Sequence, residues 1–117
     1  MQSASDGETF TFDGLLGVVM GNQTLAERAA RECLKLMPPL QARMAQALSD
    51  SNRRELAAAA HQLRGMAANM GAKQLSRVAA TLETGAVSDS FERLAQQHAQ
   101  VLEAWRAVEA VLNAQVG

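Results

Sequence analysis

Residues 53–75 read RRELAAAAHQLRGMAANMGAKQL, and this stretch decides the fold. A helix turns by roughly 100° per residue, so apolar side chains three and four residues apart gather on one face. Asn52 precedes the stretch as a helix-capping residue, and Gly71 within the stretch marks a helix end. The stretch therefore predicts an amphipathic helix whose buried face is formed by Leu56, Ala60, Leu63, Ala67 and Met70.

A longer helix is predicted before this stretch. Thr24 and Glu27 have the spacing of a capping box, and an apolar stripe with steps of three and four residues follows them. Pro38 and Pro39 fall inside the stripe, which keeps its phase across them, so we expect one kinked helix in preference to two. The residues of this stripe are Leu25, Ala29, Cys33, Leu36, Leu40, Met44 and Leu48.

Two further helices are predicted after Gly71. One runs from Lys73 to about Gly85 and carries Leu75, Val78, Ala79 and Leu82 on one face. The other opens near Ser88 and Asp89 and keeps a heptad seam over three repeats. The seam residues are Phe91, Leu94, His98, Val101, Trp105, Val108 and Leu112.

The beginning of the chain differs in composition from the rest. Residues 1–9 are small and polar, as in a linker, and suggest a module joined to a longer protein. Residues 10–117 form the predicted domain, in which Asp13 would cap a short helix that ends at Gly21 and Asn22. The expected fold is all-α: an antiparallel four-helix bundle with the short N-terminal helix packed across one end.

The composition of the chain argues against several classes of function. The 117 residues suffice for one domain, and 48% of them are hydrophobic while only 3% are aromatic. The net charge of −1 comes from interleaved signs, without the basic stripe or stacking aromatics of a nucleic-acid binder. One cysteine, Cys33, and two distant histidines form neither a disulfide nor a metal site of ordinary spacing.

Location and nucleotide use are predicted on similar grounds. No apolar run is long enough to span a membrane, and the N-terminus lacks the basic start of a secretion signal. We therefore expect a cytoplasmic domain, either on its own or as the cytoplasmic part of a membrane-bound protein, without direct membrane contact. Gly14, Gly17 and Gly21 do not have the spacing of a phosphate-cradling loop, so ATP-dependent kinase activity of its own is not expected.

The two histidines occupy different faces of their helices. His98 lies on the apolar seam, which predicts a packed, hydrogen-bonded core or boundary histidine. His61 points away from the buried face of its helix, among small residues and one arginine. The neighbours of His61 on that outer face are Ala57, Arg64, Gly65 and Ala68.

The outer face around His61 carries residue types that suit a reactive site. Gly65 inside a helix costs ~1 kcal/mol relative to alanine, which favours close approach by a partner there. Arg64 offers a permanently charged fork suited to phosphate. A neutral imidazole has a lone pair on one ring nitrogen, with which His61 could attack phosphorus. A solvent-exposed histidine without a role is the alternative at this position.

Residues 61–75, HQLRGMAANMGAKQL, closely resemble the signature of the histidine-containing phosphotransfer (HPt) family, His-x-Leu-Lys/Arg-Gly-Ser-x-x-x-Leu/Met-Gly-Ala-x-x-Leu. The resemblance implies a four-helix bundle in which His61 accepts a phosphoryl group from a receiver-domain aspartate and passes it to another receiver. By position, Arg64 takes the phosphate-side place and Gly65 is the contact glycine, with Ala57 and Ala68 beside it in the expected docking surface. Met66 departs from the usual small hydroxyl residue.

The resemblance also sets expectations for cofactors and partners. The domain itself would hold no cofactor and no metal, while the partner receiver would supply Mg²⁺. A monomeric phosphocarrier is expected, most naturally the C-terminal module of a hybrid sensor kinase. The sensor-kinase dimerisation helix pair shares His-x-Leu-Arg, but Gln62 and Gly65 stand where its glutamate and threonine would be. A phosphorylation-independent interaction bundle is the other alternative.

Overall fold

Five helices make up residues 9–116, the part of the chain that the computed structural model describes. They are α1 (Phe12–Val18), α2 (Gln23–Ser49), α3 (Arg53–Asn69), α4 (Lys73–Gly85) and α5 (Phe91–Val116). No strand occurs within these residues, so the all-α prediction is confirmed. The predicted linker, residues 1–9, lies outside the described residues except for Thr9.

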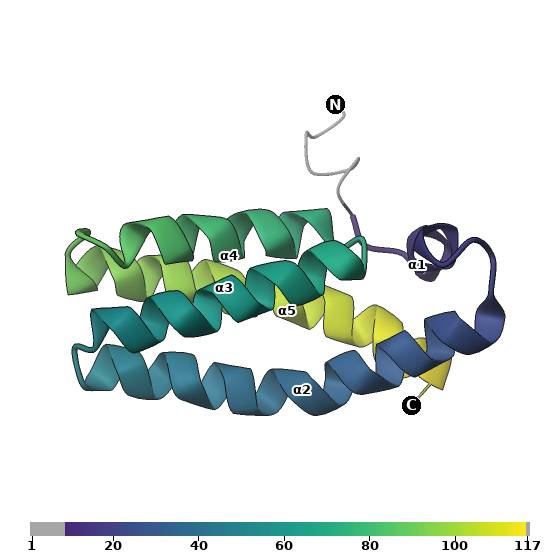
Figure 1. Cartoon of the computed structure of the whole chain (residues 1–117), viewed down its shortest axis with the longest axis horizontal. Helices are drawn as coiled ribbons and strands as arrows, with labels where there is room; N and C mark the ends of the chain where they lie inside the picture. The colour runs from purple at the N-terminus through teal and green to yellow at the C-terminus, as the bar shows by residue number, and fades with distance from the viewer. Residues whose placement is uncertain (1–8, 117) are drawn as a thin grey trace.

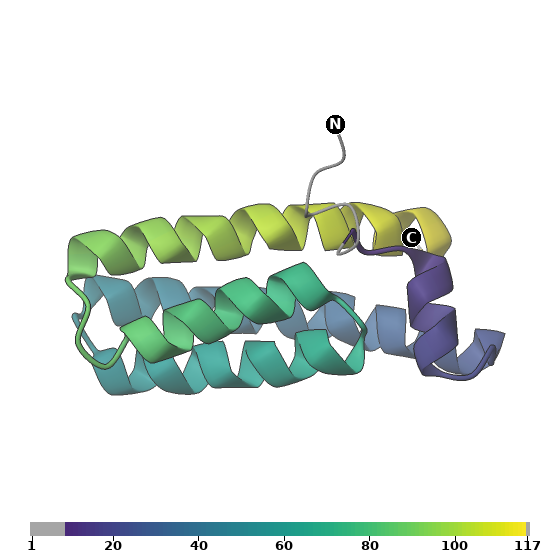
Figure 2. The ribbon, with the colours of Figure 1, turned by 90° about the horizontal axis from the view of Figure 1, so that it is seen from above.

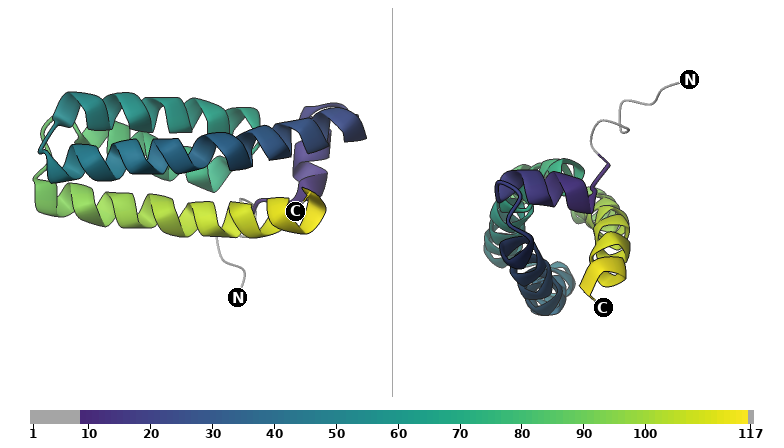
Figure 3. Two further views of the ribbon diagram at one scale, coloured as in Figure 1. Left: turned by 90° about the horizontal axis from the view of Figure 1, so that it is seen from below. Right: turned by 90° about the vertical axis from the view of Figure 1, so that its right-hand side faces the viewer.

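The four long helices form a closed ring of contacts. Helix α3 packs against α2 and α4, and α5 packs against the same two helices on the other side. Successive helices run in opposite directions (Figure 1). Helix α1 contacts α2 and α5 and crosses one end of the bundle, as Figures 2 and 3 show. The antiparallel bundle with a short helix across its end is therefore as predicted.

Leucine, alanine and methionine dominate the interior. Among the large side chains, Leu15, Met37, Leu56, Leu82 and Leu112 are fully buried. Alanines alternate with them on every long helix, and such small side chains let helix axes approach closely. Burial of this apolar surface supplies most of the stability that short helices lack on their own.

The buried stripe of α2 differs from the prediction. Cys33, Leu40 and Met44 are buried as expected, but Leu25 and Leu36 are 43% and 45% exposed. The core instead uses the neighbouring stripe, which is Ala26, Ala30, Cys33, Met37, Leu40, Met44 and Ala47. Two apolar stripes one residue apart are available in this alanine-rich helix, and the bundle buries the one whose small residues permit close packing.

Two helix caps lie upstream of the residues that were predicted to be caps. Thr11 caps α1, and Asn22 caps α2; each side chain accepts a hydrogen bond from the amide three residues on. The predicted caps, Asp13 and Thr24, lie inside the first turns of their helices. Both true caps have an oxygen that reaches a free amide at the helix start, so local chemistry allowed either choice. The cap of α3, Asn52, is as predicted.

Pro38 and Pro39 lie inside one continuous helix, as expected. Its ribbon bends in the middle part of its length (Figure 1), as a mid-helix proline requires. Beyond the prolines, α2 packs along α3. There Arg43 of α2 donates to Glu55 Oε2 at 2.8 Å and to Gln62 Oε1 at 2.8 Å, which ties the two helices together.

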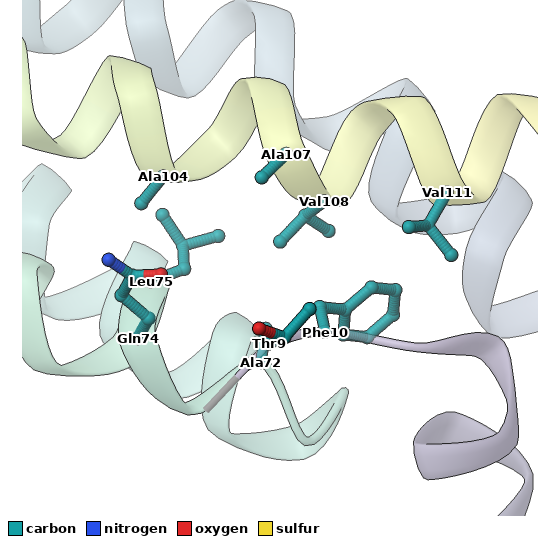
Figure 4. A pocket seen from close by; sticks show the side chains of 9 residues that line it. All are labelled: Thr9, Phe10, Ala72, Gln74, Leu75, Ala104, Ala107, Val108 and Val111. Atoms are coloured by element: carbon teal, nitrogen blue, oxygen red, sulfur yellow. The ribbon is translucent and has the colours of Figure 1, made fainter. Parts of the chain in front are cut away.

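The turn between α3 and α4 sets the two helices side by side. Gly71 has φ of 73°, a left-handed conformation that glycine adopts without strain and that ends α3 sharply. Ala72 follows it into the core, and Phe10 of the N-terminal segment lies nearby, facing Val108 of α5 (Figure 4). A small cavity of about 140 Å³ remains under Phe10, far along the bundle from the middle of α3.

Candidate functional site

His61 lies in the middle of α3 and points outward. Its side chain is 63% exposed, whereas Ala60 and Leu63 beside it are completely buried. The orientation follows from the helix period, because the buried face of α3 is fixed by its apolar residues. The structure thus places the exposed histidine where the sequence predicted it.

Two charged side chains meet the imidazole of His61. Its Nδ1 lies 2.8 Å from Oε2 of Glu83 on α4 and 3.0 Å from Nη2 of Arg64 on its own helix. Arg64 Nε in turn donates to the other oxygen of Glu83 at 2.8 Å. The three side chains form a closed triangle in which one carboxylate bridges an imidazole and a guanidinium.

The triangle determines where the proton of a neutral imidazole lies. A carboxylate that accepts from Arg64 has no proton to offer, so the short contact between Glu83 and Nδ1 needs the proton on Nδ1. Arg64 Nη2 then cannot donate to the same nitrogen and is only held close to it. A neutral ring with its proton on Nδ1 carries its lone pair on Nε2. Nε2 is therefore the ring nitrogen of His61 whose lone pair is free.

Arg64 is placed beside the imidazole but is not freely mobile. Its side chain is about half exposed, and its Nε is engaged by Glu83. Its backbone carbonyl accepts a hydrogen bond from Ser76 of α4 at 3.3 Å, which also fixes this turn of α3 against α4. A guanidinium held near a nucleophile can stabilise the charge of an anionic group that arrives there. The prediction that Arg64 adjoins His61 is confirmed in geometry.

Small residues surround the site on α3. A Cβ added to Gly65 would meet nothing within 4 Å, so no contact inside the described domain requires a glycine there. Gly65 and Ala68 are exposed, and Ala57, one turn before His61, is partly buried. These three predicted docking residues have small side chains or none, so the imidazole of His61 extends beyond them. Apart from Arg64, which is bound to Glu83, the α3 residues one turn from His61 have small side chains or none.

Glu83 is the one residue of the triangle that sequence reasoning did not single out. Two antiparallel helices joined by a tight turn bring together residues at similar distances from that turn. His61 and Glu83 stand ten residues before and twelve residues after Gly71. That spacing, together with the opposite charge of Glu83 and Arg64, is the signal that could have found it. The chain position of Glu83 alone indicates only an exposed acidic residue.

Gln62, the neighbour of His61, belongs to another contact. Its Oε1 accepts from Arg43 of α2, on the side of α3 away from Glu83. Arg43 also pairs with Glu55, and the hydrogen bond from Arg43 lowers the pKa of that carboxyl. Gln62 therefore ties α3 to α2 and does not assist the imidazole.

His98 has a different environment, on α5 near α2. It is partly buried, and its Nε2 has no hydrogen-bond partner among the described residues. The prediction of a hydrogen-bonded histidine is therefore wrong for this nitrogen. The groove beside the ring is lined by Ala42, Ala45 and Leu102 together with the polar residues Gln41, Arg106 and Glu109. Burial lowers the pKa of His98, so the ring is held in its neutral form.

The described residues show neither a candidate metal site nor a helix that could cross a membrane. Residues 9–116 contain no group of three histidine, cysteine, aspartate or glutamate side chains arranged to hold a metal ion. None of the helices within that range is long and apolar enough to cross a membrane. Cys33 is buried, which raises the pKa of its thiol to about 11.

Comparison with known proteins assigns the family. The model of the Hpt domain family matches residues 28–114, which include His61, Arg64 and Glu83. The crystal structure of the HPT domain from a sensor hybrid histidine kinase of Shewanella superposes with a TM-score of 0.79. It is 18% identical in sequence, and the match covers 92% of each chain. No curated protein shows a significant match.

The chain therefore belongs to the Hpt domain family, the histidine phosphotransfer domains of phosphorelays. Such domains interact with receiver domains. The solved neighbour has the same helical bundle, so the fold is shared as well as the family.

Proposed function

We propose that His61 is the phosphorylated residue and that its Nε2 exchanges a phosphoryl group with receiver-domain aspartates. The observation that carries the proposal is the contact of 2.8 Å between Nδ1 and Glu83. It keeps the proton on the inner nitrogen and leaves the outer nitrogen with its lone pair. Among the described histidines, His61 alone combines this orientation with an exposed ring.

The chemical step is a transfer between two nucleophiles. The Nε2 lone pair attacks the phosphorus of an aspartyl phosphate, an N–P bond forms, and the P–O bond to the aspartate breaks. The aspartate leaves as a carboxylate, and Nδ1 keeps its proton, so no base has to remove one. The imidazole ring gains a positive charge that lies next to the Glu83 carboxylate.

The same arrangement supports transfer onward. A phosphorylated imidazole that keeps its Nδ1 proton is a good leaving group, because the neutral ring is restored when the N–P bond breaks. Glu83 favours the charged ring, and Arg64 lies where it can contact phosphoryl oxygens. In this proposal His61 is both nucleophile and carrier, and the receiver contributes Mg²⁺ to neutralise the phosphoryl group.

The docking surface in the proposal consists of Ala57, Gly65 and Ala68 around His61. Its support is the low relief of α3 there and the open space above Gly65. We further propose that the domain works as a monomeric cytoplasmic module of a hybrid sensor kinase. The linker-like composition of residues 1–9 and the source of the solved neighbour support that setting.

A transfer assay tests the proposal. Receiver domains are labelled with radioactive acetyl phosphate and mixed with the wild-type chain, His61→Gln or His98→Gln. We expect acid-labile, alkali-stable label on the wild type and on His98→Gln, and none on His61→Gln. All three should be folded by circular dichroism. The exposed substitution at His61 shifts stability by within about 0.5 kcal/mol, and the substitution at the partly buried His98 lowers stability without unfolding the domain.

Equal labelling of His61→Gln would contradict the proposal. No transfer from any receiver to the folded wild type would favour a bundle that binds partners without phosphorylation.

A further inference from the structure

Val87 is an exposed apolar residue in the turn between α4 and α5. Its exposed fraction is 75%, the second highest of the large hydrophobic residues in the described chain. Single exposed hydrophobic residues are ordinary on protein surfaces, so exposure alone assigns no role to Val87. What distinguishes it is its position relative to the site.

The side of α4 that faces α3 can be traced through three contacts. Ser76 bonds to the backbone of Arg64, and Glu83 bonds to His61 and Arg64. Val87 follows Glu83 by one helical turn. The backbone keeps the helical conformation at Ala86, with φ of −58° and ψ of −21°, although α4 formally ends at Gly85. The Val87 amide bonds to the Thr84 carbonyl at 3.3 Å, a tighter turn than in an α-helix, so Val87 lies one turn beyond Glu83 and is rotated slightly toward solvent from the line through Ser76 and Glu83.

The start of α3 lies directly beside this turn. Arg53 Nη1 donates to the carbonyl of Ala86 at 3.2 Å. Ala57 and His61 follow Arg53 along the same helix, each one turn further on. The turn that carries Val87 and the start of α3 lie at the same end of the bundle (Figure 1). Val87, Ala57 and His61 thus lie in sequence along the outer α3–α4 face.

The turn is held in a fixed conformation. The Arg53 guanidinium also lies 4.4 Å from the centroid of the Phe91 ring, at the start of α5. Asp89 closes the turn from the other side, because its amide bonds to the Gly85 carbonyl at 2.8 Å and its carboxylate accepts from Gln97. An apolar side chain on such a support loses little freedom when a partner covers it.

We propose that Val87 is an apolar anchor at the edge of the receiver-docking surface and inserts into an apolar recess of the receiver domain. The proposal rests on the proposed function, since the receiver that reaches His61 is the partner whose footprint extends past Ala57. Continuity with that surface assigns Val87 to the receiver and not to a second copy of this chain. Val87 acts on affinity and partner choice, and it takes no part in the chemical step.

The test compares three variants with the wild type. Val87→Ala shortens the anchor, Val87→Asp replaces it with a charge, and Ala99→Asp is the matched control. Ala99 is exposed on α5, which packs against α2 and α4. The probe is the isolated receiver domain that labels the wild-type chain fastest, and its Kd is measured by titration calorimetry. Phosphoramidate, which needs no docking, provides a separate readout of His61 labelling.

We expect Kd to rise about fivefold for Val87→Ala and at least about tenfold for Val87→Asp. Ala99→Asp should change Kd by less than about twofold, as for a charge far from an interface. Labelling by phosphoramidate should be the same in all four proteins. Kd values for both Val87 variants equal to that of Ala99→Asp would overturn the inference.

Two further outcomes separate the inference from the function on which it rests. Labelling of the wild type by receivers together with unchanged Kd in the Val87 variants would overturn the anchor alone. Self-association of the wild type that Val87→Asp abolishes, with unchanged receiver binding, would assign Val87 to a second copy and equally overturn the inference. Failure of all receivers to label the wild type would contradict the proposed function.

Discussion

The outer face of α3 and α4 and the face between α2 and α5 each present one histidine, with opposite surroundings. His61 is exposed, and its Nδ1 meets a carboxylate and a guanidinium. His98 is partly buried beside a groove of mixed apolar and polar residues, and its Nε2 has no hydrogen-bond partner within the described chain. The difference teaches that a histidine becomes chemically useful through a partner that fixes its proton and a surface that leaves its other nitrogen open.

The largest effect should follow from removing Glu83. Glu83→Ala leaves the tautomer of His61 unfixed, so we expect the rate of transfer from a receiver to fall by about tenfold or more. Glu83→Gln keeps an oxygen that can accept from Nδ1 and should retain more activity than Glu83→Ala. Rapid-quench measurement of phosphoryl transfer checks both. Equal rates in the wild type and Glu83→Ala would break the comparison, since His61 would then need no partner.

Arg64→Ala should give a smaller loss in transfer. The guanidinium meets its partner charge only when a phosphoryl group is near, so transfer should slow by severalfold while the Kd of the unphosphorylated complex changes little. Calorimetric titration and transfer kinetics on the same variant separate the two quantities. Equal losses in both would make Arg64 a plain interface residue.

Alanine substitution should change the stability of the domain in opposite directions at two glycines. Gly65 faces open space, so Gly65→Ala should raise the free energy of unfolding by up to ~1 kcal/mol. At Gly85 an added Cβ would lie 2.6 Å from oxygens of Asp89 and Gln97. These oxygens belong to side chains held by the Gln97–Asp89 hydrogen bond, with Gln97 buried, so Gly85→Ala should disturb that bond and lower stability by about 1 kcal/mol. Urea unfolding of both variants checks the opposite signs.

Receiver binding provides a functional control for Gly65. Gly65→Gln should fold but dock poorly, because a long side chain would stand between His61 and the receiver. Native binding by this variant would remove the reason for a glycine on the outer face and exclude the small-residue surface as the docking site.

The smallest effect concerns acid stability at His98. Burial lowers the pKa of His98 in the folded chain, so the unfolded chain takes up a proton first as the pH falls. This contribution to stability is fully present above the unfolded pKa of ~6.5 and is lost progressively below it. His98→Leu should reduce the loss of stability between pH 7 and pH 5 and leave transfer unchanged. An identical pH dependence in the two proteins would contradict the burial of a neutral ring.

The helix faces of α3 and the bundle architecture were predictable from sequence, whereas two helix caps and the contacts between particular side chains were not. The outward direction of His61 follows from the apolar residues of α3, and Asn52 and Gly71 mark its ends by their own chemistry. The buried stripe of α2 was not decided locally, since Leu36 and Met37 are equally apolar and only packing selects Met37. The same limit applied to the candidate site.

Glu83 illustrates that limit most clearly. Its contact with His61 depends on how α4 lies against α3, which the length of the turn at Gly71 sets but no single residue of α4 reveals. The sequence thus located the exposed histidine and the adjacent arginine but not the carboxylate that connects them. Helix periodicity determines faces, whereas the pairing of faces is a property of the packed bundle.

The most direct test of the account is the position of phosphorus on the phosphorylated chain. Uniformly ¹⁵N-labelled protein is phosphorylated by a receiver domain and studied by NMR, with detection of coupling between ³¹P and the ring nitrogens. We predict coupling to Nε2 of His61, with the proton of that ring on Nδ1. Phosphorus on Nδ1 of His61, or on His98, would contradict the central claim that Glu83 fixes the tautomer and exposes Nε2 for transfer.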